Sequence, residues 1–243
     1  MTPRHEHSGR RFATTHWSTV MQLDAPRAAD AHSALVELCL RYWYPAYAYV
    51  RHCGHPQAIA QDITRSFLQH LFVHFRDEGT ARAQGQFRRY LLSRLQAFLA
   101  DDWRVVVTSD VIAELAAPPG DLELRNQHDN ADAGSPEQAY QQCFALEVLA
   151  RALANLRKEA RETDRLDMYE VLEPLIALDP APGEYEELAR HLHTRPLALV
   201  VALKRLRQRF RELTDAELAD LVASPEELFA EQQALHAALH RSR

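Results

Sequence analysis

The sequence predicts an all-α protein made of two helical domains, and three observations lead to this prediction. Apolar residues recur at helical spacing along most of the 243 residues, the alternation that marks strands is scarce, and three Ser- or Thr-led capping patterns mark helix starts. The composition, 47% hydrophobic and 26% charged, is ordinary for a globular protein. It excludes the collagen-like and Gly-rich low-complexity classes.

Composition also bears on the compartment. No apolar run approaches the roughly 18 to 20 residues of a membrane span, and the first residues contain no apolar signal-peptide core. Cys39, Cys53 and Cys143 are odd in number and scattered, which argues against a disulfide framework. We therefore expect a cytoplasmic protein without a membrane partner.

The first predicted domain spans residues 1–104 and contains several helices. One helix has apolar positions at i, i+1, i+4, i+5 and i+8, and two later helices repeat apolar residues every four positions. The residues that carry these patterns are Ala34, Leu35, Leu38, Cys39 and Tyr42, then Ile63, Phe67, Leu71 and Phe75, then Leu91, Leu95 and Leu99.

Residues 105–135 are predicted to form an acidic linker. The stretch 108–134 has no clean period, and it contains Pro118, Pro119 and Gly120. A second helical domain is then predicted over 136–213, with a C-terminal helical extension over 214–243.

Three capping patterns place helix starts in the second half of the chain. Ser135, Thr214 and Ser224 each supply a hydroxyl, and Glu or Gln follows at the third helical position. Two of the three also carry Pro at the first helical position, where its missing N–H has no cost.

The charge is unevenly distributed, although the net charge is −6. Residues 1–104 hold 13 Lys/Arg and 9 Asp/Glu, whereas residues 105–135 hold 1 and 6. Residues 188–211 hold seven Lys/Arg and no acidic residue. Local basic windows of this kind set the field that a nearby polyanion meets, so the negative total does not exclude nucleic acid.

The strongest functional pattern lies between Glu184 and Leu213. A short amphipathic helix is followed by a break at residues 193–196 and by a second helix with a basic end, which is the helix-turn-helix pattern. A plain αα-hairpin with a solvated basic stripe fits the same pattern. Residues 197–203 are apolar and offer no base-reading side chain before Lys204.

A second pattern combines aromatic and basic residues in the first half, around residues 42–51 and 87–104. Aromatic rings can stack on unpaired bases while arginines neutralise phosphates. Aromatic residues at helical spacing also form ordinary cores, so this pattern alone leaves both interpretations open.

In order and spacing, these motifs resemble the extracytoplasmic-function (ECF) sigma factors, the two-domain σ2/σ4 branch of the sigma-70 family. R-Y-W-Y-P-A-Y-A-Y-V-R is similar to the start of region 2, and A-Q-D-I-T-R-S-F-L-Q to region 2.2. F-R-R-Y-L-L-S-R-L-Q-A-F-L-A-D-D-W-R resembles regions 2.3 and 2.4, and E-L-A-R-H-L through R-L-R-Q-R-F-R-E-L resembles region 4.2. The resemblance covers nearly the whole chain.

The resemblance implies a transcription initiation factor that binds core RNA polymerase and promoter DNA, with no enzyme activity and no cofactor. The surface for the β′ clamp helices would comprise Gln61, Asp62, Arg65 and Gln69. The −10 element would meet the loop 76–86 together with Arg88, Arg89, Arg94 and Trp103. The −35 element would meet Thr194, Arg195, Lys204, Arg205 and Arg207.

Region 2.2 departs from the family pattern. Where the family carries an acidic run, residues 59–66 keep one carboxylate, Asp62, and gain Arg65. One similar branch is activated by a Ser/Thr kinase, and a phosphate adds about −1.5 to −2 charge. Thr64 is the aligned candidate for phosphorylation and Ser66 is the second candidate; an unmodified helix that has lost its acidic residues is the alternative.

Other departures concern the turn and the helix that would read DNA. His193 occupies the position of the family's turn glycine, where a histidine can adopt the left-handed conformation at some strain. These departures keep open a second function class, a sigma-like adaptor that binds protein partners and reads no promoter. Short His spacings, such as His236 and His240, lack a third ligand, and no metal site is predicted.

Overall fold

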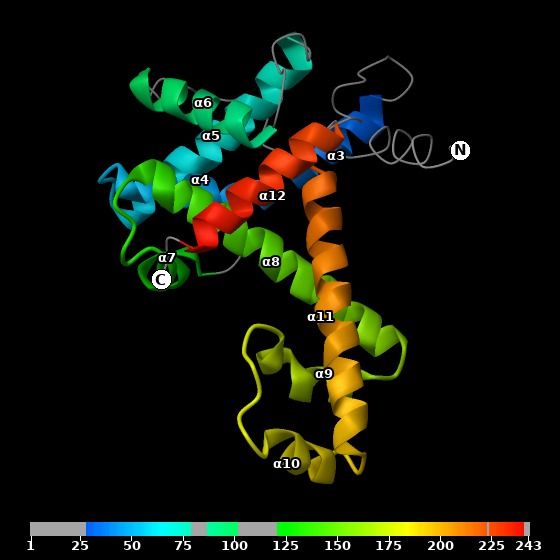
Figure 1. Ribbon diagram of the computed structural model, residues 1–243. Coiled ribbons are helices and arrows are strands. Elements are labelled where there is room, and N and C mark those ends of the chain that lie inside the picture. Colours follow the sequence, from blue (N-terminus) through cyan, green and yellow to red (C-terminus); the bar gives the residue numbers. More distant parts are fainter. Residues whose placement is uncertain (1–27, 79–86, 102–120, 223, 241–243) are drawn as a thin grey trace. The chain divides into compact units, whose positions relative to one another are not determined.

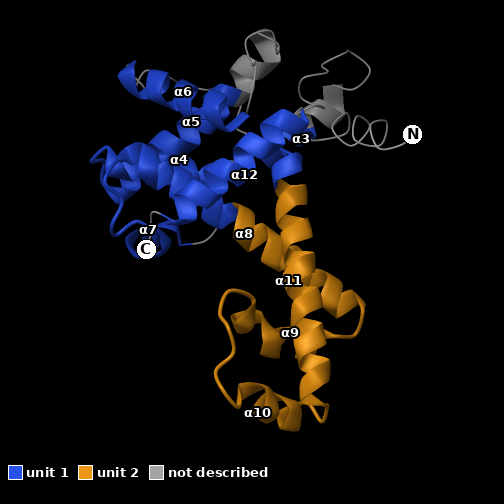
Figure 2. Ribbon diagram, in the orientation of Figure 1, with its two compact units in different colours: residues 1–147, 218–243 blue, residues 148–217 orange. Residues whose placement is uncertain are grey.

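The computed structural model describes residues 28–78, 87–101, 121–222 and 224–240 (Figure 1). Every regular element within these ranges is a helix, which confirms the all-α prediction. None of the described helices combines the length and the apolar character needed to cross a membrane. The chain divides into two compact units, one of residues 1–147 and 218–243 and one of residues 148–217 (Figure 2).

This division differs from the predicted domain boundaries. Unit 1 takes in part of the expected linker, the start of the expected second domain and most of the C-terminal extension. Its helices are α3 (Ala28–Arg41), α4 (Trp43–His52), α5 (Gln57–Glu78), α6 (Phe87–Ala100), α7 (Leu122–Asp129), the first half of α8 (Pro136–Glu162) and α12 (Pro225–His240).

The core of unit 1 is aromatic and is centred on α4. All residues from Trp43 to Val50 are buried, which is typical of a helix that neighbouring helices cover on every side. Tyr42 precedes α4, and its ring stacks on Phe144 with centroids 5.5 Å apart. The aromatic run of the first half therefore builds a core, one of the two interpretations left open by its pattern.

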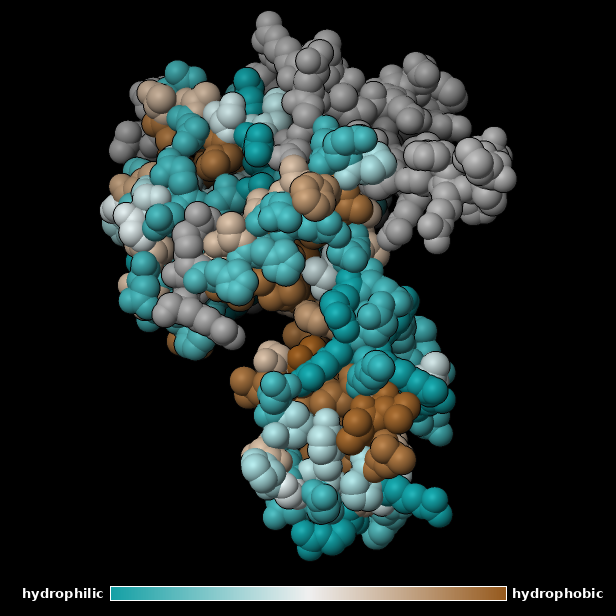
Figure 3. Space-filling view, in the orientation of Figure 1, coloured by the Kyte–Doolittle hydropathy of each residue, from teal (hydrophilic) through white to brown (hydrophobic). Residues whose placement is uncertain are grey.

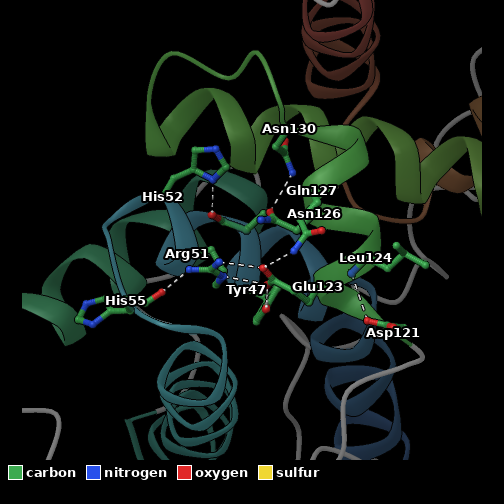
Figure 4. Close-up of polar contacts among 11 residues, drawn as sticks. Tyr47, Arg51, His52, His55, Asp121, Glu123, Leu124, Asn126, Gln127 and Asn130 are labelled. Carbon is green, nitrogen blue, oxygen red and sulfur yellow. Dashed lines mark hydrogen bonds and ion pairs between the residues drawn. The ribbon is translucent and has the colours of Figure 1, made fainter.

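Helix α7 lies inside the segment predicted as a linker. Asp121 caps its start, since its side chain accepts a hydrogen bond from the Leu124 N–H at 3.1 Å. Glu123 is ion-paired with Arg51 of α4 at 2.8 Å and also accepts a hydrogen bond from the Tyr47 hydroxyl (Figure 4). This part of the expected linker is therefore a helix anchored to the core of unit 1.

Two of the three capping predictions are confirmed. Ser135 accepts a hydrogen bond from the Gln138 N–H, and Ser224 from the Glu227 N–H, each at 3.2 Å. The prediction at Thr214 is wrong, because α11 (Pro196–Ala219) continues through it. The Thr214 hydroxyl instead donates to the Phe210 carbonyl at 2.9 Å, as a threonine inside a helix commonly does.

Unit 2 is a small helical bundle. It contains the second half of α8, α9 (Leu166–Leu172), the 3-10 turn η5 (Glu173–Ile176), α10 (Glu184–His191) and α11 up to residue 217. The apolar faces of these helices form two adjoining clusters. One consists of Ala152, Leu156, Ala160, Tyr169 and Leu213, and the other of Leu172, Leu175 and Leu203.

Candidate functional site

Helices α10 and α11 of unit 2 are joined by a short turn at the break that the sequence predicts. His193 has a φ of 49°, so this histidine adopts the left-handed conformation. The Thr194 N–H donates to the Ala189 carbonyl at 2.9 Å and the His193 N–H to the Arg190 carbonyl at 3.4 Å, which is the hydrogen-bond pair of a Schellman motif. Pro196 then starts α11.

Four of the five residues expected to contact the −35 element remain available at the surface. Arg195, Lys204 and Arg205 are exposed and have no acidic partner within the described parts of the chain, and Thr194 is partly exposed. Arg207 does not fit this role. Its guanidinium donates to the carbonyls of Leu175 and Leu178 at 2.8 and 2.7 Å and pairs with Asp179, so it fixes the segment between η5 and α10.

In the folded protein, acidic residues from outside the basic window 188–211 neutralise part of its charge. Arg209 pairs with Glu159 of α8 at 2.6 Å and with Glu212 at 3.0 Å. These hydrogen bonds raise the pKa of Arg209 and lower the pKa of Glu159. The sequence window contains no acid, but the fold brings acids from outside the window to Arg207 and Arg209. The cationic surface is thereby reduced to Arg195, Lys204 and Arg205 with Arg190 and Arg211.

The N-terminal part of α11 is apolar at its surface. Leu197 is 73% exposed, Val200 41% and Val201 43%. A recognition helix reads bases with polar side chains near its N-terminus, and these three cannot donate or accept a hydrogen bond. The surface suits phosphate contact by the flanking cations together with apolar contact to another molecule.

The described residues expected to contact the −10 element differ in accessibility. Arg88 is only 5% exposed: its Nε donates to Glu231 of α12 at 2.8 Å, and its guanidinium lies 5.2 Å from the centre of the Phe144 ring. This prediction is wrong for Arg88, because α12 satisfies its charge inside unit 1. Arg89 is exposed and Arg94 partly exposed. Trp103 and residues 79–86 of the expected loop lie outside the described residues, and α5 extends to Glu78.

The expected polymerase surface on α5 is smaller than predicted. Asp62 and Arg65 are accessible and form an ion pair with each other, while Gln61 is partly exposed. Gln69 is 6% exposed and belongs to the buried side of the helix, so it cannot be part of an open surface. Because the pair Asp62–Arg65 neutralises itself, this surface carries little net charge.

The two phosphorylation candidates differ in accessibility. Thr64 is fully buried, and its hydroxyl donates to the Ala60 carbonyl at 2.7 Å. Ser66 is partly exposed. A kinase must reach the hydroxyl oxygen, so the folded structure presents Ser66 and withholds Thr64.

Three acidic residues with structural roles were not identified from the sequence. Glu123 and Glu231 anchor α7 and α12 to unit 1, and Asp179 holds Arg207. The Arg51 guanidinium holds the pKa of Glu123 down at about 2. Each acid lies at least 28 residues from its arginine, so no local spacing marks the pair.

The described residues contain no group of three or more His, Cys, Asp or Glu side chains that could hold a metal ion. Burial raises the pKa of the Cys39 and Cys143 thiols to about 12, which keeps both protonated at neutral pH.

Comparison of the chain with protein-family models, with curated proteins and with solved structures found no match.

Proposed function

We propose that this chain is an ECF-type sigma factor, which joins core RNA polymerase and directs it to promoters. The observation that carries the proposal is the helix-turn-helix of α10 and α11, whose second helix carries exposed Arg195, Lys204 and Arg205. Cations placed around a helix of this kind match phosphates on both sides of a major groove. The sequence motifs of regions 2 and 4 support the same role.

The contacts in this role follow from accessibility. Arg195, Lys204 and Arg205, with Thr194 beside them, would meet the −35 element, and Arg89 and Arg94 would meet the −10 element. Because the first turns of α11 expose Leu197 and Val201, phosphate contacts would dominate and sequence reading would be weak.

The proposed polymerase surface is the accessible part of α5 around Asp62. The family's acidic run is missing here, and Arg65 cancels the one remaining carboxylate. A phosphate on Ser66 would add about −1.5 to −2 charge beside this pair and strengthen attraction to a basic partner. We therefore place activation by a Ser/Thr kinase at Ser66 rather than at the buried Thr64.

Binding to duplex DNA of mixed sequence, titrated with salt, tests the DNA-binding part of the proposal. The logarithm of the affinity falls with the logarithm of the salt concentration by about 0.9 for each neutralised phosphate. We expect Lys204→Glu and Arg205→Glu each to reduce this slope by about one. Arg161→Glu, which changes an exposed arginine on α8, is the matched control and should leave the slope unchanged.

Co-purification with core RNA polymerase tests the polymerase-binding part of the proposal. The polymerase should retain at least one of two proteins, the wild type and the Ser66→Glu variant. At moderate salt it should retain the Ser66→Glu variant more strongly than the wild type. Absence of binding by both proteins would contradict the sigma-factor proposal.

A second candidate function is an adaptor that binds protein partners and reads no promoter. The exposed apolar residues at the N-terminal part of α11 favour it, since DNA offers them little apolar surface. A DNA affinity that is absent, or that does not respond to salt, would select the adaptor.

A further inference from the structure

A long open groove in unit 2 is lined by α8, α9 and α11, and its volume is about 830 Å³. Sites that bind small molecules usually have volumes of roughly 300–1,000 Å³. Side chains of α11 line the groove from Leu197 to Arg209, a length of about 18 Å at 1.5 Å per residue. The groove therefore has the size and the elongated form of a site for one extended small molecule.

The interior of the groove is apolar. Leu156, Met168, Val201 and Leu206 line it, and Leu197 stands at one end. Leu197 is 73% exposed and Val201 43%, so the groove leaves large apolar side chains in water. Figure 3 shows apolar surface over this part of α11. A ligand that fills the groove must therefore be apolar over most of its length.

Three arginines at the groove carry charge that the fold does not neutralise. Arg165, Arg195 and Arg205 line the groove, and each lacks an acidic partner among the residues that the structure covers. The acid in the lining, Glu159, is already held by Arg209 at 2.6 Å and 2.8 Å. Cations gathered beside an apolar groove favour a ligand that also carries negative charge.

One of these arginines continues the exposed apolar stripe of α11. Leu197, Val201 and Arg205 follow one another at i, i+4 and i+8, so their side chains lie along one face of the helix. Leu197 and Arg205 are about 12 Å apart along the helix axis. An alkyl chain that lies over Leu197 and Val201 would therefore bring a headgroup to Arg205.

We propose that this groove binds a single-chain anionic amphiphile, such as a free long-chain fatty acid. The alkyl chain would cover Leu197 and Val201 and take their apolar surface out of water. The carboxylate would accept hydrogen bonds from the Arg205 guanidinium, whose planar fork matches the two carboxylate oxygens. The ligand thus satisfies the exposed apolar stripe and one unpaired cation at the same time.

This ligand would also compete with DNA, because Arg205 is one of the proposed −35 contacts. That consequence rests on the proposed function, whereas binding of the amphiphile does not. A carboxylate on Arg205 would remove one cation from the DNA-binding surface, so the ligand would weaken promoter binding.

The test of ligand binding uses the full chain and isothermal titration calorimetry with laurate below its micelle concentration, without polymerase or DNA. Each buried methylene is worth about fourfold in affinity, so octanoate, four methylenes shorter, should bind at least about tenfold more weakly. Dodecyltrimethylammonium keeps the length of the chain and reverses the charge, and it should bind more weakly than laurate. Circular dichroism at the same ligand concentrations verifies that the helices remain folded.

Matched variants separate the groove from its surroundings. Leu197→Gln and Arg205→Glu change exposed positions, so both variants retain the fold, and each should weaken laurate binding at least about fivefold. Leu178 is 64% exposed and lies outside the groove, and Lys204 neighbours Arg205 on α11 but does not line the groove. Leu178→Gln and Lys204→Glu should leave the affinity for laurate unchanged.

Competition is measured separately, by titrating laurate into the complex with duplex DNA. Laurate should weaken DNA binding by the wild type, and it should have less effect on Leu197→Gln at the same concentration. Binding of laurate by a chain that binds no DNA would support the groove site and contradict the DNA-binding function.

Four results would overturn the proposal. The first is absence of laurate binding by the wild type. The second is equal affinity for laurate and dodecyltrimethylammonium, which would remove the charge preference. The third is an equal loss for Lys204→Glu and Arg205→Glu, which would indicate general attraction to the basic helix. The fourth is binding to vesicles of phosphatidylglycerol without binding of laurate, which would assign these residues to a membrane surface.

Discussion

Arg88 and Glu231 form a buried ion pair, with their side chains 5% and 2% exposed and Nε 2.8 Å from the carboxylate. The two residues are 143 positions apart, on α6 and α12. The pair fixes the C-terminal helix to unit 1 and withdraws from DNA an arginine that the sequence resemblance would assign to the −10 element. The predicted C-terminal extension is thus an integral part of the first unit.

Removing one partner of this pair should destabilise unit 1. Glu231→Gln leaves Arg88 charged and buried, and a broken buried pair costs about 3–5 kcal/mol of unfolding free energy. Chemical denaturation followed by circular dichroism measures this change. Arg88→Met combined with Glu231→Leu removes both charges and should be less destabilised than Glu231→Gln alone. Equal stability of Glu231→Gln and wild type would contradict the buried pair.

The Glu123–Arg51 pair should make the unfolding free energy depend on pH. Hydrogen bonds from Arg51 and then from Tyr47 hold the pKa of Glu123 at about 2 in the folded protein, below its ordinary 4.5. A depressed folded pKa contributes stability above the unfolded pKa, and this contribution is lost as pH falls through the folded pKa. The unfolding free energy of the wild type should therefore fall between about pH 4.5 and pH 2.

Glu123→Gln isolates this effect from the titration of other carboxyl groups. At neutral pH the variant should be less stable than the wild type by about 1.5–3 kcal/mol, since hydrogen bonds to a charged group are lost. The difference should shrink as the pH approaches 2. A difference that stays constant over this range would show that Glu123 does not titrate with a depressed pKa.

Local patterns predicted much of the fold because they depend on neighbouring residues. The helical periods, the caps at Ser135 and Ser224 and the left-handed His193 all arise from interactions within a few positions. Helix α7 was missed because its sequence is polar and its anchor, Glu123 to Arg51, spans 72 positions. The cap at Thr214 failed because a threonine can equally bond a carbonyl one turn back inside a helix.

The difference between local and long-range interactions also explains which parts of the candidate site the sequence could predict. The sequence identifies which residues are cationic, but accessibility depends on distant partners. Arg207 and Arg209 find acids or carbonyls outside the basic window, and Arg88 finds one on α12. The groove beside α11 was not predicted at all, since it requires the packing of α8, α9 and α11 together.

The turn at His193 predicts a stabilising substitution. For a residue other than glycine, the left-handed conformation costs about 1–2 kcal/mol of folding free energy. Glycine avoids this cost, but its greater freedom in the unfolded chain lowers the unfolding free energy by up to about 1 kcal/mol. His193→Gly should therefore raise the unfolding free energy by about 0.5 kcal/mol, measured by denaturant titration. His191→Gly, at the last residue of α10, is the control and should lower it by about 0.5–1 kcal/mol. Destabilisation by His193→Gly would contradict the left-handed turn.

Burial distinguishes the two phosphorylation candidates. Thr64→Glu places a carboxylate where the side chain is fully buried, and it should lower the unfolding free energy by about 3 kcal/mol or more. Ser66→Glu changes a partly exposed position and should cost less than about 1 kcal/mol. Thr64→Val keeps the shape of the side chain and should stay within about 1.5 kcal/mol of wild type, since it removes one hydrogen bond, to Ala60. Thermal and chemical unfolding of the three variants measures these differences. Equal stability of Thr64→Glu and Ser66→Glu would mean that Thr64 reaches solvent, and would return it to the accessible phosphorylation candidates.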